Sequence, residues 1–385
     1  MKKITLFINS LTSGGAEKVL SVLITELVAQ KFNVELLCIE KDMTQSIPKE
    51  VKVIYLSKLT KYDSNIKKFL YLPYLALKLK RDIQKNNIKL IQSHIYRANF
   101  INLLAKLFGA KHQAQVVEVT SIGNLMGKAL SQKINFFLIK HLYPHADLII
   151  FKAKKMQSEF LKQIPFTGNT IIINNPYNIE QIKKLSSLTI NDFTFDKEKK
   201  YLLSMGRLNF AKRFDMLIYA LNSLEEHVEL IIIGEGEEED NLKRLIQEQN
   251  LSSRVHLLGK ESNPFSYVKQ ADIFVLASEG EGFPNVLVEA MICRTAVIST
   301  DCISGPREIL APNTDIDYQL SNSIEKAQNG ILYPVNNQKL LIDSINLLLN
   351  DQTLRNSYES IGEEASKAYA LEKIIEQYKE VLCVV

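Results

Sequence analysis

The sequence predicts an α/β protein in which two doubly wound domains, each with a mainly parallel sheet, follow one another. Its 385 residues exceed the length at which a single hydrophobic core usually keeps growing. Short apolar runs, typical of strands buried on both faces, alternate with helical segments along the chain. This alternation breaks once, in a polar stretch before residue 200, and then starts again. We therefore expect two separate cores.

The composition is that of a globular protein, with 46% hydrophobic and 23% charged residues. No apolar run reaches the roughly 18 residues that would span a bilayer. The cysteines form no CxxC or Cys/His cluster, which argues against a disulfide framework and a zinc site and favours a reducing cytoplasm. They are Cys38, Cys293, Cys302 and Cys383.

The two halves of the chain carry opposite net charge. Residues 1–190 hold 28 Lys and Arg against 12 Asp and Glu, a net +16, whereas residues 191–385 hold 19 against 31, a net −12. This asymmetry indicates that the first half faces something anionic, such as phosphate, nucleic acid or a membrane surface.

The first domain is predicted over residues 1–180. It opens with the strand KITLFINS, a Gly-Gly turn, a helix from AEKVLSVL onward and the strand NVELLCIE, which together form a βαβ unit. Further strands separated by helical stretches are predicted at VKVIYL, IKLIQSH, AQVVEVT, ADLIIF and TIIINN.

The second domain is predicted over residues 201–368, after a polar linker at residues 181–200. Its strands are YLLSMGRL, VELIIIGEG, VHLLG, ADIFVLAS, AVISTD and ILYPV, with helices that include FDMLIYALNSL and NVLVEAMIC. Both domains are thus Rossmann-like. Residues 369–385 form a last helix that could return to the first domain.

Candidate ligand-binding residues follow the strands, because doubly wound sheets bind ligands beyond the carboxyl ends of their strands. Glycines there would let the backbone approach a phosphate closely, although a Gly-Gly pair is also typical of a simple turn. Two cations five residues apart can clamp a diphosphate from two sides, or be solvated surface residues. These residues are Gly14, Gly15, Gly234 and Gly236, and the cations Arg207 and Lys212.

Two acids, Glu281 and Glu289, flank the uncharged run GFPNVLV. One interpretation is a loop acid followed by an acid near a helix N-terminus. However, Glu289 falls in a mostly apolar helix, where a buried carboxylate needs polar partners. Sugar hydroxyls are such partners.

The E-x7-E pattern from Glu281 to Glu289, the G-R-x4-K of GRLNFAK and the downstream SGPREIL make nearly the whole chain resemble the retaining glycosyltransferases of family 4. The resemblance implies the GT-B fold, with a cleft between an acceptor-binding first domain, residues 1–180, and a nucleotide-sugar-binding second domain, residues 201–368. It also implies a nucleotide-sugar donor without a further cofactor or metal. Finally, it implies that Arg207 and Lys212 hold the donor diphosphate, that Glu281 contacts donor-sugar hydroxyls and that Glu289 binds the ribose.

By the same resemblance, the loop after Glu281 would lay backbone N–H groups along the donor and stabilise charge on the leaving diphosphate. The acceptor hydroxyl would attack from the front face, and the departing phosphate would help remove its proton. A metal role for the D-x-D of Asp315 and Asp317 is rejected, because no strand delivers it to the donor site. The loop residues are Gly282, Phe283, Pro284 and Asn285.

The sequence departs from the family pattern in three places. Many relatives have a His, near the donor sugar, where this chain reads EVTSIGN. Glu118 is a candidate catalytic substitute that could equally be a structural acid, and His94 is a second candidate, although a lone His after a strand is more often structural. The usual E-G-F-G reads EGFP. Arg294 stands where a Gly is expected after Cys293.

Residues 58–89 form a basic amphipathic segment with nine Lys or Arg and two Asp among Phe, Tyr and Leu. Such a segment can lie on an anionic membrane or hold the diphosphate of a lipid carrier. The alternative is a solvated helix packed on the sheet. No RNA-recognition motif occurs, so nucleic acid is not an expected partner. We expect peripheral association with the inner face of the cytoplasmic membrane.

Within the family, the motifs most resemble bacterial enzymes that extend polyprenyl-diphosphate-linked glycans with N-acetylhexosamine. The expected reaction is transfer of a hexose or N-acetylhexosamine, GalNAc or GlcNAc, from a UDP-sugar to such a lipid-linked acceptor. The alternatives are a UDP-HexNAc 2-epimerase of the same fold, a glycoside hydrolase, whose two acids must flank one scissile bond, and a non-catalytic carbohydrate-binding protein.

Overall fold

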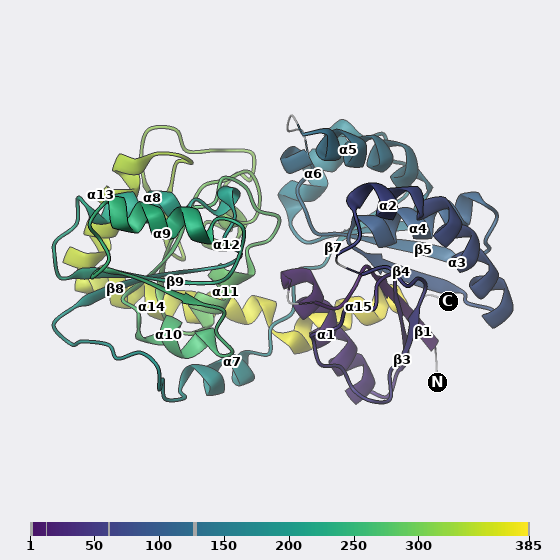
Figure 1. Cartoon of the computed structure of the whole chain (residues 1–385), viewed down its shortest axis with the longest axis horizontal. Coiled ribbons are helices and arrows are strands. Elements are labelled where there is room, and N and C mark those ends of the chain that lie inside the picture. The colour runs from purple at the N-terminus through teal and green to yellow at the C-terminus, as the bar shows by residue number, and fades with distance from the viewer. Residues whose placement is uncertain (1–2, 13, 61, 126–128, 384–385) are drawn as a thin grey trace. The chain divides into compact units, whose positions relative to one another are not determined.

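The computed structural model of the chain describes residues 3–383 except residues 13, 61 and 126–128. The chain divides into two compact units. Unit 1 comprises residues 1–177 and 371–385, and unit 2 comprises residues 178–370. Each unit has helices on both faces of one central sheet (Figure 1), which confirms the prediction of two doubly wound α/β domains.

The sheet of unit 1 has seven strands in the order β3-β2-β1-β4-β5-β6-β7, all parallel. All seven strands predicted for the first domain are present. They are β1 (Lys3–Ile8), β2 (Asn33–Cys38), β3 (Lys52–Tyr55), β4 (Leu90–His94), β5 (Gln113–Glu118), β6 (Leu148–Phe151) and β7 (Asn169–Ile172). The five inner strands are largely buried between two helical layers, whereas the edge strands β3 and β7 are only half-buried.

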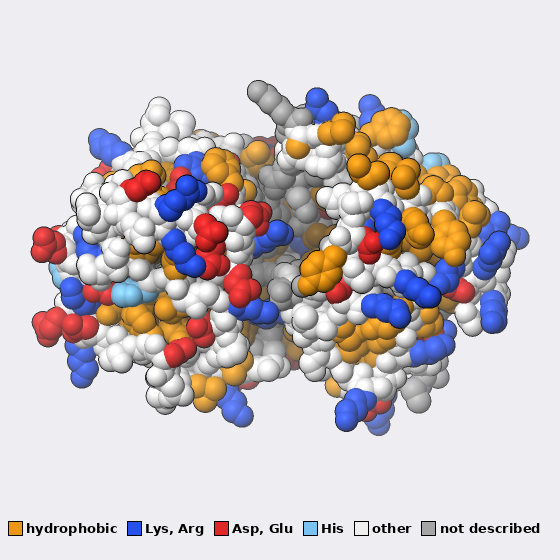
Figure 2. Space-filling model, viewed as in Figure 1, with side chains coloured by type: hydrophobic (Ala, Val, Ile, Leu, Met, Phe, Trp, Pro, Cys, Tyr) orange, Lys and Arg blue, Asp and Glu red, His pale blue; other side chains and the backbone are white. Residues whose placement is uncertain are grey.

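The helices of unit 1 cover both faces of this sheet (Figure 1). Helices α1 and α15 share a core with β1, β2, β5 and β6 on one face. Hydrophobic side chains also remain on the outer surface of α2, α3 and α5, beside Lys and Arg (Figure 2). The helices are α1 (Gly15–Ala29), α2 (Asn65–Leu70), α3 (Leu72–Asn86), α4 (Tyr96–Leu107), α5 (Leu130–Leu142), α6 (Lys154–Gln163) and α15 (Leu371–Leu382), with short 3-10 turns at Ile122–Leu125 and Tyr143–His145.

The last helix, α15, is attached to unit 1 by buried polar contacts as well as by apolar packing. The Lys152 ammonium, 2% exposed, donates to the Tyr378 hydroxyl and to the Ile173 carbonyl at 3.3 Å. Gln115 Nε2 donates to the Val381 carbonyl at 2.6 Å. Burial lowers the pKa of Lys152 to about 7, because a desolvated amine prefers its neutral form.

The sheet of unit 2 also has seven strands, in the order β10-β9-β8-β11-β12-β14-β13. The first six are parallel, and the short edge strand β13 runs antiparallel to β14. Strand β13 has only two residues, too few to give an alternating pattern, and the sequence therefore does not predict it. The strands are β8 (Lys200–Met205), β9 (Val228–Ile233), β10 (Val255–Gly259), β11 (Ile273–Leu276), β12 (Ala296–Thr300), β13 (Glu325–Lys326) and β14 (Ile331–Tyr333).

The helices of unit 2 include one that extends into the segment predicted as a linker. Helix α7 begins at Ile179 and packs against α10 and α11, so part of residues 181–200 is ordered structure of unit 2. The helices are α7 (Ile179–Ser186), α8 (Phe214–Leu221), α9 (Glu239–Glu248), α10 (Pro264–Gln270), α11 (Asn285–Ile292), α12 (Pro306–Leu310), α13 (Gln338–Asn350) and α14 (Gln352–Ser366), with 3-10 turns at Phe210–Lys212 and Lys367–Tyr369.

Two loops of unit 2 lie in backbone contact at the carboxyl edge of the sheet. A Cβ at Gly234, where φ is +152°, would lie 1.8 Å from the Gly206 carbonyl oxygen, and a Cβ at Gly236 would lie 2.2 Å from that of Leu208. The Leu208 amide donates to the Glu235 carbonyl at 2.9 Å. The glycines therefore serve the packing of the β8 and β9 loops, which positions Arg207.

Gly234→Ala should destabilise the protein by about 3 kcal/mol or more, because the methyl group would force the two loops apart. Gly259→Ala is the matched control: Gly259 also has a positive φ, +71°, but a Cβ there meets open space, so about 1 kcal/mol is expected. Urea unfolding of both variants measures the difference. Equal losses would contradict the close contact.

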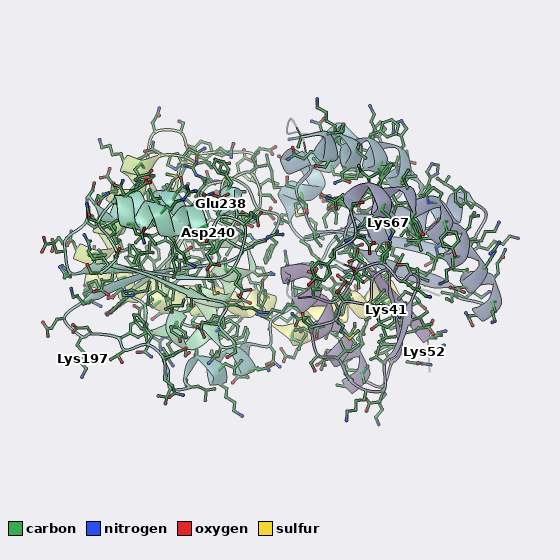
Figure 3. The ribbon with its side chains drawn as sticks, viewed as in Figure 1. Lys41, Lys52, Lys67, Lys197, Glu238 and Asp240 are labelled. Carbon is green, nitrogen blue, oxygen red and sulfur yellow. The ribbon has the colours of Figure 1, made fainter. Side chains whose placement is uncertain are left out.

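Lys152→Met should change how stability depends on pH. Between the folded pKa of about 7 and the ordinary value of 10.5, the unfolded chain binds this proton more tightly, so wild-type stability should rise with pH across that window. The free energy of unfolding, wild type minus variant, should therefore increase by as much as about 4 kcal/mol from pH 7 to pH 10. The exposed lysine Lys41, labelled in Figure 3, provides the control variant Lys41→Met, which should leave the pH dependence unchanged. If the free energies of unfolding of wild type and Lys152→Met changed with pH in parallel, this would contradict the lowered pKa of Lys152.

Candidate active site

The carboxyl edge of the unit 2 sheet gathers the predicted donor-binding residues. The strand order reverses between β8 and β11, and at such a switch point the loops leave a crevice that binds ligands. Arg207 and Lys212 follow β8, Gly234 and Gly236 follow β9, and residues 281–285 follow β11.

Lys212 and Glu281 form a direct ion pair at this edge. Lys212 Nζ lies 2.5 Å from Glu281 Oε1, and the two side chains are only 21% and 11% exposed. The loops that carry them are joined by a hydrogen bond from the Glu279 amide to the Ala211 carbonyl, at 2.9 Å. A cation suited to a phosphate and an acid suited to sugar hydroxyls therefore lie at one point, although they are 69 residues apart in sequence.

Arg207 does not join this pair. Its guanidinium lies 3.1 Å from Glu237 Oε2, and the two side chains are 71% and 55% exposed. Glu237 belongs to the acidic stretch at the start of α9, where Figure 3 labels Glu238 and Asp240. Because an exposed ion pair is weak, a ligand phosphate can replace Glu237 as the partner of Arg207.

The loop after Glu281 is held by its neighbours. Gly282 accepts a hydrogen bond from Ser304 Oγ at 2.9 Å. The Phe283 ring packs edge-on against Tyr369, with centroids 5.4 Å apart, so this side chain belongs to the core. Pro284 has no N–H, which corrects the prediction for one residue of this loop: only Gly282, Phe283 and Asn285 can donate from the backbone.

Glu289 lies one turn into α11 and is 6% exposed, so the prediction that it faces the buried side is confirmed. A carboxylate at this depth requires hydrogen-bonding partners. At the end of α11, Arg294, which stands where the resemblance implies Gly, adopts the left-handed conformation with φ +61°. Its side chain reaches Glu363, with 3.3 Å between Nε and Oε2.

Sequence reasoning missed the ion pair behind SGPREIL. Arg307 donates to Asp301 from Nε at 3.0 Å and from Nη2 at 2.6 Å, and both residues are buried. Arg307 also donates to Glu325 at 2.9 Å. Asp301 directly follows β12, so this bidentate pair fixes the next loop along the edge. In the sequence, an Arg six residues after an acid is not a pattern that predicts an ion pair.

Glu118 is buried at the carboxyl end of β5 in unit 1, 5% exposed. Its carboxylate accepts from the Val119 and Thr120 amides, each at 3.0 Å, and from the Tyr143 hydroxyl at 2.8 Å. Burial raises the pKa of Glu118 to about 7. Beside it is a cavity large enough for about one water, lined mainly by apolar side chains. These contacts favour the structural interpretation of Glu118.

His94 is also buried, 2% exposed, and its Nε2 lies 3.2 Å from Gln92 Oε1. Burial, together with the charge of Lys152, lowers the pKa of His94 to about 3, so the ring is neutral at physiological pH. The structural interpretation is again favoured. The following residue, Ile95, has φ +69°, a strained value for a β-branched residue, and turns the chain directly from β4 into α4.

Gly14 and Gly15 begin helix α1. The Glu17 side chain folds back over Gly14, where a Cβ would lie 2.2 Å from Glu17 Oε2. The helix N-terminus thus already has an acidic neighbour, and burial raises the pKa of Glu17. This contact does not favour a phosphate at Gly14.

Asp315 and Asp317 lie in an exposed loop of unit 2, where Asp315 Oδ1 accepts from the Asp317 amide at 2.9 Å. Within the part of the chain that the structure describes, no three His, Cys, Asp or Glu residues are grouped so that they could hold a metal ion. In the same described residues, no helix is long and apolar enough to cross a bilayer.

Comparison with known proteins agrees with this geometry. Residues 13–181 match the family model described as "Glycosyltransferase Family 4", and residues 187–368 match "Glycosyl transferases group 1". The chain is 33% identical, over 97% of both sequences, to the N-acetylgalactosamine-N,N'-diacetylbacillosaminyl-diphospho-undecaprenol 4-alpha-N-acetylgalactosaminyltransferase of Campylobacter jejuni. It is 26% identical, over 74% of each chain, to the N,N'-diacetylbacillosaminyl-diphospho-undecaprenol alpha-1,3-N-acetylgalactosaminyltransferase of that species.

Solved structures share the fold at lower identity. Sucrose-phosphate synthase from Thermosynechococcus elongatus superposes with a TM-score of 0.82 at 19% identity, covering 99% of this chain and 98% of that one. The Anabaena protein HepE in complex with UDP-glucose gives 0.75 at 19% identity, with complete coverage of both chains. The predicted family and fold are confirmed: this chain belongs to the family 4 glycosyltransferases, enzymes with the GT-B fold.

Proposed function

We propose that this enzyme is a retaining transferase that moves an N-acetylhexosamine from a UDP-sugar to a polyprenyl-diphosphate-linked oligosaccharide in bacterial glycan assembly. The observation that supports it most is the Lys212–Glu281 pair at the switch point of the unit 2 sheet. The Campylobacter relatives, named for N-acetylgalactosamine transfer to diphospho-undecaprenol glycans, support the choice of sugar and acceptor.

The residues divide between the two ends of the donor. Lys212 and Arg207 hold the diphosphate, and both exchange their carboxylate partners for phosphate oxygens when the donor binds. Released from Lys212, Glu281 accepts hydrogen bonds from hydroxyls of the transferring sugar, and the buried Glu289 accepts from the ribose. The cations stabilise charge that grows on the leaving diphosphate, so they favour the transition state. Proton removal by the departing phosphate needs no protein base, in keeping with the burial of Glu118 and His94.

The assay for this function combines purified enzyme, a UDP-N-acetylhexosamine and a polyprenyl-diphosphate glycan, with product mass as readout. Product heavier by one or more N-acetylhexosamine units, and UDP release that requires the acceptor, are expected. Conversion of the UDP-sugar without acceptor would instead indicate the 2-epimerase. Binding of the glycan without turnover would indicate a carbohydrate-binding protein. Activity should persist in EDTA.

The surface of helices α2 and α3 supports association with a membrane. One side of α3 is buried in unit 1, yet a stripe on the opposite side of the two helices is apolar and exposed. A purely solvated helix would present polar residues there. The apolar stripe and the nearby Lys and Arg together suit an anionic lipid surface (Figure 2). The stripe consists of Ile66 (75% exposed), Leu70 (69%), Tyr74 (60%) and Leu77 (45%).

Several lysines of this segment also have partners within unit 1. Lys68 Nζ lies 3.1 Å from Glu40, and Lys78 and Lys80 donate to the Leu56 and Phe108 carbonyls at 2.7 and 2.5 Å. Replacing these lysines would therefore disturb contacts within unit 1 as well as remove positive charge. The exposed apolar stripe is therefore the better place to test membrane binding.

Glu281→Gln should reduce transfer mainly through kcat, because the acid meets the reacting sugar, whereas Glu289→Gln should mainly raise the KM of the donor. A loss of roughly 10- to 100-fold is expected for each, the effect of one charged hydrogen bond of about 1.5–3 kcal/mol. Steady-state kinetics with varied donor separates the two. Small, equal effects on kcat would refute the assignment.

The double variant Leu70→Ser, Tyr74→Ser should bind vesicles of phosphatidylglycerol and phosphatidylethanolamine at least about tenfold more weakly than wild type, because two apolar side chains no longer enter the lipid. Tyr219→Ser, at an exposed tyrosine on α8 of unit 2, is the matched control. Sedimentation measures the bound fraction, and donor binding should remain. Unchanged sedimentation of the double variant would restore the solvated-helix interpretation.

A further inference from the structure

Arg213 adopts a backbone conformation that is uncommon for its residue type. It directly follows the 3-10 turn at Phe210–Lys212 and precedes α8, with φ +52° and ψ 42°. A residue with a Cβ loses roughly 1–2 kcal/mol in this left-handed region, which usually holds Gly or Asn. Such strain persists where the surrounding contacts fix the conformation, and it marks positions that a function can require.

The guanidinium of Arg213 joins three segments of unit 2. Nε and Nη2 donate to Asp215, in the first turn of α8, each at 3.0 Å. Nη1 donates to Glu279 Oε1 at 2.9 Å, in the loop after β11, and to Asn336 Oδ1, in the loop after β14. The Phe210 ring covers the guanidinium, with 5.6 Å between its centroid and Cζ. Only 17% of the Arg213 side chain is exposed, so it cross-links loops rather than extending into solvent.

The loops after β8 and β11, which Arg213 joins, also carry the Lys212–Glu281 pair. Lys212 immediately precedes Arg213, and Glu281 is two residues after Glu279. In the proposed function, the donor separates Lys212 from Glu281, because each then binds a different part of the donor. That link between the loops is thus lost when the loops must be aligned. The Arg213–Glu279 contact, and the hydrogen bond from the Glu279 amide to the Ala211 carbonyl, involve other atoms and can remain.

We propose that Arg213 is a positioning residue of the donor site, which keeps the loops after β8 and β11 aligned while Lys212 and Glu281 change partners. This inference rests on the proposed function. The planar guanidinium can hold Asp215 and Glu279 at once from different nitrogens, whereas a lysine has a single ammonium. Loops that are aligned before the donor arrives lose less conformational entropy when it binds, so the affinity for the donor is higher.

A second ion pair connects the same two strands at their other end. Lys200, the first residue of β8, lies 3.1 Å from Asp272, which directly precedes β11. Both of its side chains are partly exposed, as are those of Arg213 and Glu279. Because the strands are parallel, this pair lies at the amino edge of the sheet, away from the donor site. Lys200→Met is therefore a matched control, which removes a link between β8 and β11 without touching the carboxyl edge.

Isothermal titration calorimetry with UDP tests the positioning role. Arg213→Met should raise the dissociation constant of UDP about tenfold, the effect of one coupled ion pair, and Lys200→Met should leave it within about twofold of wild type. Arg213→Lys can still pair with Glu279 and should recover most of the affinity. If Arg213→Met does not fold, Glu279→Gln removes the charge from the other side of the link and should give the same loss. Wild-type affinity without the link, or an equal loss in Lys200→Met, would overturn the proposal.

Hydrogen–deuterium exchange tests the same link without any ligand. The Glu279 amide is protected by the Ala211 carbonyl, so it should exchange roughly tenfold faster in Arg213→Met, while the amides of β8 should exchange as in wild type. Unchanged exchange at Glu279 would overturn the proposal even if UDP bound more weakly, because Arg213 would then act on the ligand directly. If wild type does not bind UDP at all, the proposed function fails, and the exchange rates still decide whether Arg213 aligns the two loops.

Discussion

Parallel pairing of β8 with β11 is the constraint on which the proposed donor site of unit 2 depends. Parallel neighbours end at the same edge of a sheet, so the loops after β8 and β11 must meet there although 69 residues separate Lys212 from Glu281. The switch in strand order sends the adjoining connections to opposite faces, the arrangement that favours ligand binding at this edge. The glycine contact between the β8 and β9 loops and the Asp301–Arg307 pair after β12 then fix the loops on both sides. The geometry of the proposed donor site therefore follows from where the strands end.

The two sheets use their carboxyl edges differently. In unit 2, the two ion pairs Arg207–Glu237 and Lys212–Glu281 are partly or largely exposed to solvent, so a ligand can exchange with a partner in each pair. In unit 1, the polar residues that end β4 and β5 are buried and already hydrogen-bonded within the protein: Glu118 to two amides and Tyr143, and His94 to Gln92. A group whose hydrogen bonds are satisfied internally shapes a loop and gains little from a ligand. This contrast supports assigning donor chemistry to unit 2 and leaving Glu118 and His94 outside the catalytic set.

The sequence was sufficient for most of the fold because apolar strand runs and helical periods are local signals. It also located Arg207, Lys212, Glu281 and Glu289, since their positions after strands and within one helix are readable from order alone. Burial of Glu118 and His94 could not be read in this way, because it depends on which helix covers which face. The pairing of Lys152 with Tyr378 joins residues 226 apart, and that of Tyr318 with Arg307 depends on how a long loop folds back. Such contacts leave no periodic pattern in the sequence. A loop residue can also lack the backbone N–H that its predicted role requires, as Pro284 does.

The return of α15 to unit 1 bears on the order in which the protein can fold during synthesis. Unit 2 is one continuous segment, residues 178–370, whereas unit 1 is interrupted and needs residues from 371 onward. On the ribosome, the seven strands of unit 1 emerge first but lack the helix that covers Ile150, Val117 and the buried amine of Lys152. Unit 2 can therefore complete its core while unit 1 still exposes apolar surface and Lys152 lacks its Tyr378 partner. Unit 1 is synthesised first, but its core is completed last, when α15 emerges. Until then, unit 1 is the half of the chain that most needs protection from aggregation.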